Sequence, residues 1–273
     1  MAARIVFVCQ QGRLETQGLL LAASLRLHFP HDCKLIAAWP SREGELSGET
    51  QAALASLDVE VAEIQNPMAA DYLIGHKLAA LALVQGDGPG LFLDSDMIAM
   101  RSPGALPQGL AAVPASSHHC GLNTWQYLYE RFDLDMPAEG PATLLSQDTI
   151  APYFNSGLVS VAGADARAFA DCWTDCARRI DTDPLVPAAA KRPYLDQVAL
   201  PIAAALLQRD IAVLEEAWNY RGWGFALEDE ADPILYHYQD PVRLGRADRS
   251  AAAAHAAKSV TPAVAQALRE LEF

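Results

Sequence analysis

The sequence predicts an α/β fold, in which a mostly parallel central sheet carries helices on both faces. Short apolar runs alternate with longer amphipathic segments through the first hundred residues. This alternation is typical of parallel strands, because each one reaches the next through a long crossover that is usually a helix. The chain has 273 residues, of which 51% are hydrophobic types. That suffices for one substantial core, and neither a repeat nor a linker divides it, so we expect one domain.

The first half of the chain has the clearest strand and helix patterns. Buried strands are expected at the short apolar runs, residues 5–9, 34–38, 59–63 and 91–93. Helices are expected at the amphipathic segments between them, residues 14–29, 49–57 and 70–84. Pro30 ends the first helix because proline cannot continue it, and the glycines of Gly86–Gly90 mark the turn before the fourth strand.

The pattern becomes less regular after Arg101. The apolar runs predict strands at residues 111–114, 153–161, 211–214 and 234–238. Periodic segments predict helices at residues 125–132, 165–180 and 196–208. Near the end, residues 251–257 are mostly alanine and are expected to be helical, while Thr261 and Pro262 suit the N-cap and first position of a C-terminal helix.

The charge of the chain excludes one class of partner. Its formal net charge is −14, from 34 acidic and 20 basic residues. Such a field repels phosphate backbones, so we expect no nucleic-acid partner. A nucleoside diphosphate can still bind an acidic protein if a divalent cation bridges the two.

Cysteine usage and hydropathy point to a cytoplasmic enzyme without a membrane span. The five cysteines are scattered and form no CxxC pair, which disfavours a zinc site and favours free thiols in a reducing compartment. No apolar run approaches the ~18 residues that cross a bilayer. The run Ile5–Cys9 is too short for a signal peptide.

Two strand ends carry polar residues where ligands bind in parallel sheets. Gln10-Gln11-Gly12 follows the first strand, and Asp94-Ser95-Asp96 follows the fourth. Neither a GxGxxG motif after the first strand nor a GxxxxGK[ST] motif is present, so a dinucleotide site or a P-loop is not supported.

The pair Asp94 and Asp96 is the strongest candidate for a metal site. One reading is a solvated turn, since two aspartates at this spacing are common. However, Leu91–Leu93 precedes the pair and Met97–Met100 follows it, and carboxylates within an apolar run are costly unless they are coordinated or paired. Carboxylates are ligands for Mg²⁺ or Mn²⁺, which can neutralise a diphosphate leaving group.

Four segments resemble family 8 of the GT-A glycosyltransferases, the family of glycogenin and bacterial galactosyltransferases. They are Phe92–Ile98 with its two aspartates, Tyr153–Val159, Leu195–Val198 and Ile234–Tyr238. They follow the family's order and span roughly residues 4–243, close to a whole GT-A domain. The resemblance implies a GT-A fold, with a nucleotide-binding half at 1–100, a donor and acceptor half at 101–245, and a helical tail at 246–273.

The resemblance also implies roles for individual residues. Asp94, Asp96 and His237 would bind the metal, and an imidazole ligand suits Mn²⁺ better than Mg²⁺. Asp196 and Gln197 would lie beside the transferred sugar and its anomeric carbon. The nucleotide sugar would be held by Gln10, Lys77, Asp94, Ser95, Asn155, Ser156 and Gly157.

Other residues are weaker candidates for the same site. The stretch Trp218–Trp223 suits a pocket wall, so we expect Trp218 and Asn219 near the donor, and His118 and His119 could contact an acceptor. Structural alternatives exist for several residues: His237 as an ordinary strand histidine, Lys77 as a solvated helix residue, Asn155 as a turn residue, and Asp196 as a helix first-turn acid.

One motif departs from the family. After His237 the family has a glycine, a lysine and Pro-Trp, whereas this chain has Asp240 for the glycine, Arg243 for the lysine, and no Pro-Trp. Arginine and lysine are not interchangeable as phosphate ligands, so the departure points to a distant branch.

The predicted reaction is transfer of a hexosyl unit from a nucleoside diphosphate sugar, expected to be a UDP-sugar, to an acceptor hydroxyl. The family resemblance implies retention of anomeric configuration. Two other classes stay open: a sugar-phosphate nucleotidyltransferase, although Cys9–Arg13 is a poor phosphate loop, and a non-catalytic nucleotide- or glycan-binding protein.

Overall fold

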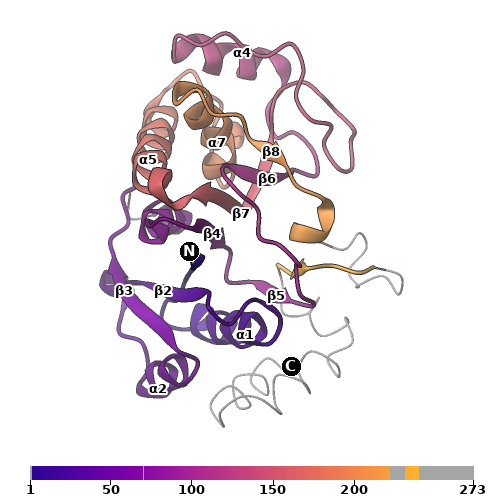
Figure 1. The fold of residues 1–273 in the computed structure, drawn as a ribbon. Helices are drawn as coiled ribbons and strands as arrows, with labels where there is room; N and C mark the ends of the chain where they lie inside the picture. The colour runs from indigo at the N-terminus through magenta and orange to yellow at the C-terminus, as the bar shows by residue number, and fades with distance from the viewer. Residues whose placement is uncertain (1, 70, 222–230, 240–273) are drawn as a thin grey trace.

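A computed structural model describes residues 2–69, 71–221 and 231–239 of the chain (Figure 1). It contains one large sheet built from strands β1 (Arg4–Val8), β2 (Lys34–Pro40), β3 (Val59–Ile64), β4 (Pro89–Leu93), β6 (Ala111–Pro114), β7 (Phe154–Ala162) and β8 (Ala212–Val213). Their order across the sheet is β3-β2-β1-β4-β7-β6-β8. The pairs β3–β2, β2–β1, β1–β4 and β6–β8 are parallel, and β7 runs antiparallel to both its neighbours. The predicted α/β class with a mostly parallel sheet is confirmed.

The sheet is buried on both faces because alternate residues of each strand face different helices. The helices are α1 (Arg13–His28), α2 (Gly48–Ser56), α3 (His76–Ala80), α4 (Leu122–Arg131), α5 (Ala166–Thr182), α6 (Ala188–Lys191) and α7 (Leu195–Leu206). Along β1, Ile5 and Phe7 belong to the core that includes α1 and α2. Val6 belongs to the core that includes α3, α5 and α7.

The order of the strands determines where a ligand can bind. From β1 the chain moves outward to β2 and β3, and then returns to place β4 on the other side of β1. A crevice forms at such a switch point, outside the carboxyl ends of the two strands. The first residues of β7 reach the same edge, because β7 is antiparallel to β4 and Leu158 pairs with Leu93.

A second, two-stranded sheet lies beside this edge and was not predicted. Strand β5 (Met97–Ala99) pairs antiparallel with β9 (Leu235–His237), with Met97 opposite His237. The Ser24 hydroxyl of α1 accepts a hydrogen bond from the Ala99 amide at 2.9 Å. The small sheet is therefore held against α1, and it brings residue 237 beside the end of β4.

The helix expected at residues 70–84 is wrong in its extent. The structure has 3₁₀ turns at η2 (Leu73–Gly75) and η3 (Leu81–Val84), with α3 only between them. The Tyr72 carbonyl accepts from the Gly75 amide at 3.0 Å, the spacing of a 3₁₀ turn, and also from the Asn66 side chain at 3.0 Å. Other short elements were also not predicted: α6, η1 (Ser41–Glu43), η4 (Gly163–Asp165) and η5 (Glu216–Asn219).

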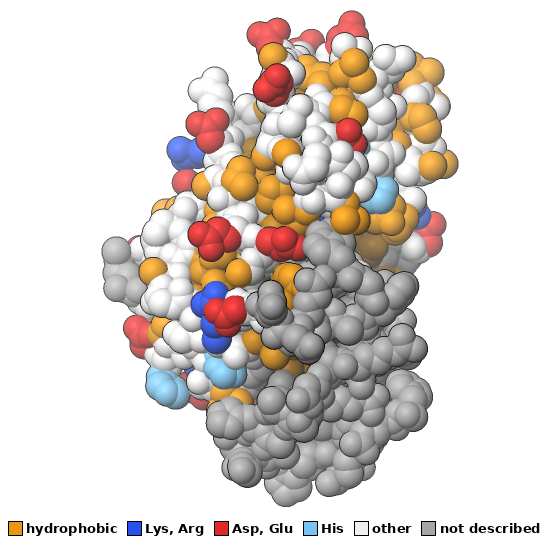
Figure 2. Space-filling view, turned by 90° about the vertical axis from the view of Figure 1, so that its right-hand side faces the viewer, with side chains coloured by type: hydrophobic (Ala, Val, Ile, Leu, Met, Phe, Trp, Pro, Cys, Tyr) orange, Lys and Arg blue, Asp and Glu red, His pale blue; other side chains and the backbone are white. Residues whose placement is uncertain are grey.

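Four further observations concern the surface charge, membrane crossing, the cysteines and the C-terminal predictions. Acidic side chains outnumber basic ones on the face shown in Figure 2, in line with the net charge of −14. Among the described residues, no helix has the length and apolar character needed to cross a membrane. All five cysteines carry free thiols. The helices predicted at residues 251–257 and from Thr261 lie outside the described residues, as does Arg243.

Candidate metal and donor site

A cavity of about 640 Å³ opens at the carboxyl ends of β1 and β4. Most of the predicted site residues line it: Gln10, Lys77, Asp94, Ser95, Asp96, Asn155, Ser156, Gly157, Asp196, Gln197 and His237. Their convergence follows from the topology, since the ends of β1 and β4 and the start of β7 meet at this edge. Asn219 lies behind this lining, fully buried. Trp218 does not line the cavity and instead meets the ring of Phe29 edge-on, with centroids 6.4 Å apart.

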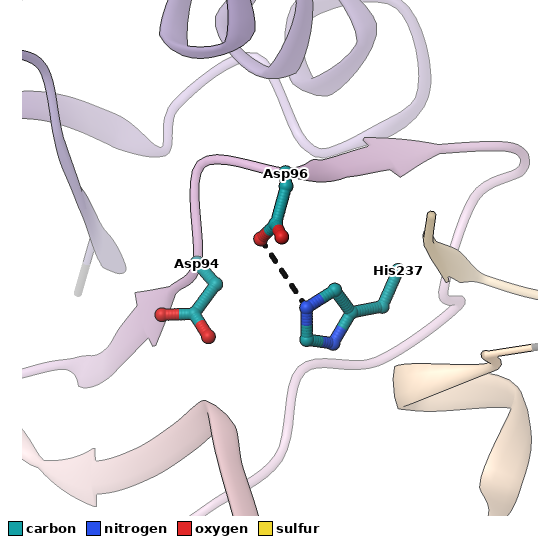
Figure 3. Close-up of side chains that lie close together, drawn as sticks. All are labelled: Asp94, Asp96 and His237. Carbon is teal, nitrogen blue, oxygen red and sulfur yellow. Dashed lines mark ion pairs between the residues drawn. The ribbon is translucent and has the colours of Figure 1, made fainter. Parts of the chain in front are cut away.

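Asp94, Asp96 and His237 converge from three strand ends (Figure 3). Asp94 follows β4, Asp96 precedes β5, and His237 ends β9. One ligand atom from each of the three lies within 4.8 Å of the others. His237 Nε2 is 3.2 Å from Asp96 Oδ1. Two carboxylates and one imidazole at this spacing can serve together as ligands of one divalent cation.

A chain of hydrogen bonds determines which nitrogen of His237 is available to a metal. The Gly157 amide can only donate, and it donates to Asn155 Oδ1 at 2.9 Å. The Asn219 amide nitrogen donates to the same oxygen at 2.7 Å, which turns Asn219 Oδ1 toward His237 Nδ1, 2.9 Å away. In neutral His237 the proton therefore resides on Nδ1, as assigned from this network. The Nε2 lone pair then faces Asp96, as a metal ligand requires.

The electrostatics of the two aspartates also fit a cation. The pKa of Asp94 is raised, chiefly because its carboxylate is removed from water; Lys77 opposes the rise and Asp96 adds to it. Burial would raise the pKa of Asp96 as well, but the neighbouring His237 lowers it below its ordinary value. A cation between the two carboxylates would offset the cost of burying Asp94 and the negative charge of Asp96 beside it.

Gly157 leaves space that any other residue would fill. A Cβ atom there would lie 2.8 Å from His237 Cε1, 2.8 Å from Asn155 Oδ1 and 3.0 Å from Asp94 Oδ2. Only glycine therefore lets the backbone of β7 come this close to Asp94 and His237.

Lys77 is not a solvated helix residue, since it is only 8% exposed. Its ammonium lies 3.0 Å from Asp94 Oδ1 and 2.9 Å from Asp196 Oδ2. Burial disfavours the charged amine, but the carboxylates of Asp196 and Asp94 outweigh this effect and raise the pKa of Lys77. Lys77 thus stays charged and forms an ion pair with Asp94 on one side and with Asp196 on the other.

Of the remaining candidates Ser95 lines the cavity, whereas His118 and His119 do not. The buried Ser95 hydroxyl donates to the Val8 carbonyl and so ties the end of β4 to the end of β1. Tyr194, which the sequence did not single out, lines the cavity and stacks on the exposed His119 ring, with centroids 3.5 Å apart. His118 instead stacks on the buried Tyr153 and accepts from Trp125.

The sequence matches the Rhodobacterales glycosyltransferase domain over residues 5–208. The chain belongs to this family. The matched region carries Lys77, both metal-site aspartates, Asn155 and Asp196, whereas His237 lies beyond it. The chain is therefore a member of the glycosyltransferase class that the sequence predicts, while membership of family 8 stays a prediction.

Solved structures share its fold at low sequence identity. WbbM, a bifunctional glycosyltransferase, is similar with a TM-score of 0.62 and 13% identity over 98% of this chain and 51% of that chain. The galactosyltransferase LgtC, solved with donor and acceptor sugar analogues, is similar with a TM-score of 0.58 and 16% identity over 94% of this chain and 96% of that chain. GlyE of Streptococcus pneumoniae gives a TM-score of 0.55 and 15% identity over 99% of this chain and 63% of that chain.

These similarities confirm the predicted GT-A fold. The chain spans about half the length of the WbbM chain. The comparison with curated proteins gave no match.

Proposed function

We propose that this glycosyltransferase moves a hexosyl unit from a UDP-sugar to an acceptor hydroxyl, with Mn²⁺ or Mg²⁺ held by Asp94, Asp96 and His237. The observation that carries the proposal is the convergence of these three side chains at one wall of a cavity that also contains Asp196. A divalent cation held there would neutralise the diphosphate as it departs.

The protein's own residues would bind and orient the donor. Lys77 offers a buried positive charge between the metal ligands and Asp196, which suits the sugar-diphosphate junction. Asn155 and Gly157 bring backbone and amide groups close to the transferred sugar. Gln197, next to Asp196 at the start of α7, faces the same cavity and would contact the sugar near its anomeric carbon.

The surroundings of Asp196 support the predicted retention of configuration. An inverting enzyme needs a carboxylate free to deprotonate the acceptor. The Asp196 carboxylate accepts hydrogen bonds from Tyr72 and Ser156 and is paired with Lys77, so both of its oxygens already have partners other than an acceptor hydroxyl. Among the described residues, the other carboxylates that line the cavity are Asp94 and Asp96, which we assign to the metal. An inverted product would contradict this assignment.

The two other classes find less support. A nucleotidyltransferase would need a basic loop after β1, but the Arg13 guanidinium donates to the Gln239 carbonyl at 3.1 Å. A non-catalytic binding protein would not need the hydrogen bonds that direct His237 Nε2 toward Asp96.

A binding titration tests the proposal. We expect UDP to bind in the presence of Mn²⁺, EDTA to abolish the binding, and the protein to release UDP slowly from a UDP-sugar. An Asp96→Asn variant should lose all three properties. Asp175→Asn is the matched control, because Asp175 lies on the exposed side of α5, where Arg179 is 4.0 Å away. Failure of the wild-type protein to bind any nucleotide with Mn²⁺ would overturn the proposal.

A further inference from the structure

Tyr72 contacts Asp196 without reaching the cavity itself. It is 3% exposed and is not among the cavity-lining residues. Its hydroxyl is 2.9 Å from Asp196 Oδ1, accepts from the Asp196 amide at 3.2 Å, and lies 3.1 Å from the Pro193 carbonyl. The hydroxyl has one proton, which it can donate to the Asp196 carboxylate or to the Pro193 carbonyl. The bond to the carboxylate is the shorter one and its acceptor is charged, so it is the stronger of the two.

The phenol is held in its protonated, donating form. Burial and the negative charge of Asp196 both raise the pKa of Tyr72. The hydroxyl therefore keeps the proton that it donates to Asp196.

Each oxygen of the Asp196 carboxylate has its own donors. Tyr72 serves Oδ1, whereas Ser156 and Lys77 serve Oδ2. The backbone carbonyl of Asp196 accepts from the Trp173 indole at 2.9 Å, which holds the main chain in place. Among the described residues, Tyr72 is thus the side chain that donates to Oδ1, and this bond opposes rotation of the carboxylate about its χ2 torsion.

Tyr72 is in turn held at its backbone and at its ring. Asn66 donates to its carbonyl at 3.0 Å. The Arg192 guanidinium lies over the ring, 5.3 Å from its centroid, and pairs with Asp71 at 2.8 Å and Asp181 at 2.7 Å. These contacts connect the segment before η2 to the segment before α7.

We infer that Tyr72 is a positioning residue, which orients the Asp196 carboxylate toward the hexosyl group of the donor. The inference rests on the proposed function, because it requires Asp196 to contact that sugar. Tyr72 acts on the sugar end of the site only: its described contacts include none with Asp94, Asp96 or His237, so metal and UDP should bind equally well without its hydroxyl. A misplacement of about 1 Å in such a group can reduce a rate ~100-fold.

The Tyr72→Phe variant isolates the hydroxyl, because the phenylalanine ring still packs below Arg192. Tyr127→Phe is the matched control: the Tyr127 hydroxyl donates to Asp183 Oδ2, also at 2.9 Å, but Tyr127 lies on α4 and does not line the cavity. The measurements are the kcat for UDP release from UDP-galactose and UDP-glucose, the KM for each, and the Kd of UDP with Mn²⁺.

We expect Tyr72→Phe to lower kcat by roughly 10- to 100-fold and to leave the Kd of UDP within about twofold of wild type. Tyr127→Phe should match the wild type in kcat and in the Kd of UDP. A general loss of structure would weaken UDP binding as well, so the split between kcat and Kd identifies positioning.

The outcomes separate the two claims. A wild-type protein that does not bind UDP with Mn²⁺ would overturn the proposed function, and the inference with it. A wild type that turns over, with Tyr72→Phe equal to Tyr127→Phe in kcat, would overturn the inference alone. Equal losses of kcat and UDP affinity would also overturn it. If Tyr72→Phe does not fold, Arg192→Gln takes its place, since it loosens the ring but keeps the hydroxyl, and it should lower kcat at an unchanged Kd.

Discussion

At the residue scale, a side chain outside the cavity lining orients one of the proposed metal ligands. Asn219 is fully buried and donates to Asn155 while its oxygen faces His237 Nδ1. Loss of either contact would let the His237 ring rotate or change tautomer, and Nε2 would no longer face Asp96. Residues that orient a ligand in this way typically contribute about 10- to 100-fold to metal affinity.

We therefore expect Asn219→Ala to weaken Mn²⁺ binding by roughly 10- to 100-fold, measured by calorimetry in the presence of UDP. Asn123→Ala, an exposed position on α4, is the control and should bind Mn²⁺ as the wild type does. Unchanged affinity in Asn219→Ala would mean that His237 is oriented by something else or is not a ligand.

A second residue-scale prediction concerns Gly157. The Cβ of a Gly157→Ala variant would meet His237 Cε1 at 2.8 Å, so the imidazole must move. We expect Mn²⁺ affinity to fall by at least about tenfold, with a destabilisation of ~1–3 kcal/mol from overpacking. In Gly48→Ala, the added Cβ meets nothing within 4 Å and both properties should be kept. Wild-type Mn²⁺ binding by Gly157→Ala would show that the site is looser than this packing implies.

At the element scale, one serine of α1 holds strand β5 of the small sheet in place. The Ser24 hydroxyl donates to the Leu21 carbonyl at 2.8 Å and accepts from the Ala99 amide at 2.9 Å. This bond anchors β5 on α1, whereas β9 and the residue before it are also held by backbone hydrogen bonds to Tyr220 and Ala217. The proposed ligands Asp96 and His237 lie at the ends of β5 and β9, so a shift of β5 would move them relative to each other.

Ser24→Ala would leave the buried Ala99 amide without its partner, which typically costs ~1–3 kcal/mol. We expect that loss in urea denaturation, together with weaker Mn²⁺ binding. Ser56→Ala is the control. The Ser56 hydroxyl also donates to a carbonyl three residues back, that of Ala53, but this bond lies within α2 and does not reach β5 or β9. Equal free energies of unfolding for the two variants would contradict the role given to Ser24.

The strands and helices also differ in how strongly the local sequence predicts them. Strands such as β1 and β4 were predicted because each is a short run of apolar residues, which is the pattern of a strand that is buried on both faces. Strand β5 has three residues and no periodicity, so only its pairing with β9 defines it. The helix around α3 is interrupted by the 3₁₀ turns η2 and η3, and the apolar pattern of residues 70–84 does not distinguish these turns from α-helix.

The same distinction holds for the candidate site. Asp94 and Asp96 follow β4, and the topology of a parallel sheet is enough to place them at the crevice beside the end of β1. Asn155 and His237 lie on antiparallel strands, so the family resemblance, and not the parallel topology, indicated their part in the site. Tyr72 and Tyr194 reach the site from connecting segments, where the direction of a side chain depends on contacts formed only in the folded chain. Their positions could not be derived from spacing.

At the scale of the whole molecule, the metal would connect distant parts of an acidic chain. Asp94 and Asp96 lie near the middle of the sequence and His237 lies near the end of the described residues. The chain carries a formal net charge of −14, and two of the three proposed ligands are carboxylates. A bound cation relieves their repulsion and joins β9 to the end of β4, so metal binding should stabilise the native state as a whole.

The final prediction follows from this coupling. At a Mn²⁺ concentration of about 100 times Kd, binding contributes ~2.7 kcal/mol, which corresponds to a rise in Tm of roughly 5–10 °C for a chain of this size. EDTA should reverse the rise, and Asp96→Asn should not show it. UDP alone should raise Tm much less than UDP with Mn²⁺, because the acidic chain repels the diphosphate unless a cation lies between them. Thermal melts in four conditions (protein alone, with Mn²⁺, with UDP, and with both) check the order. A shift with UDP alone as large as that with both would show that the nucleotide binds without the metal, and that Asp94, Asp96 and His237 serve another purpose.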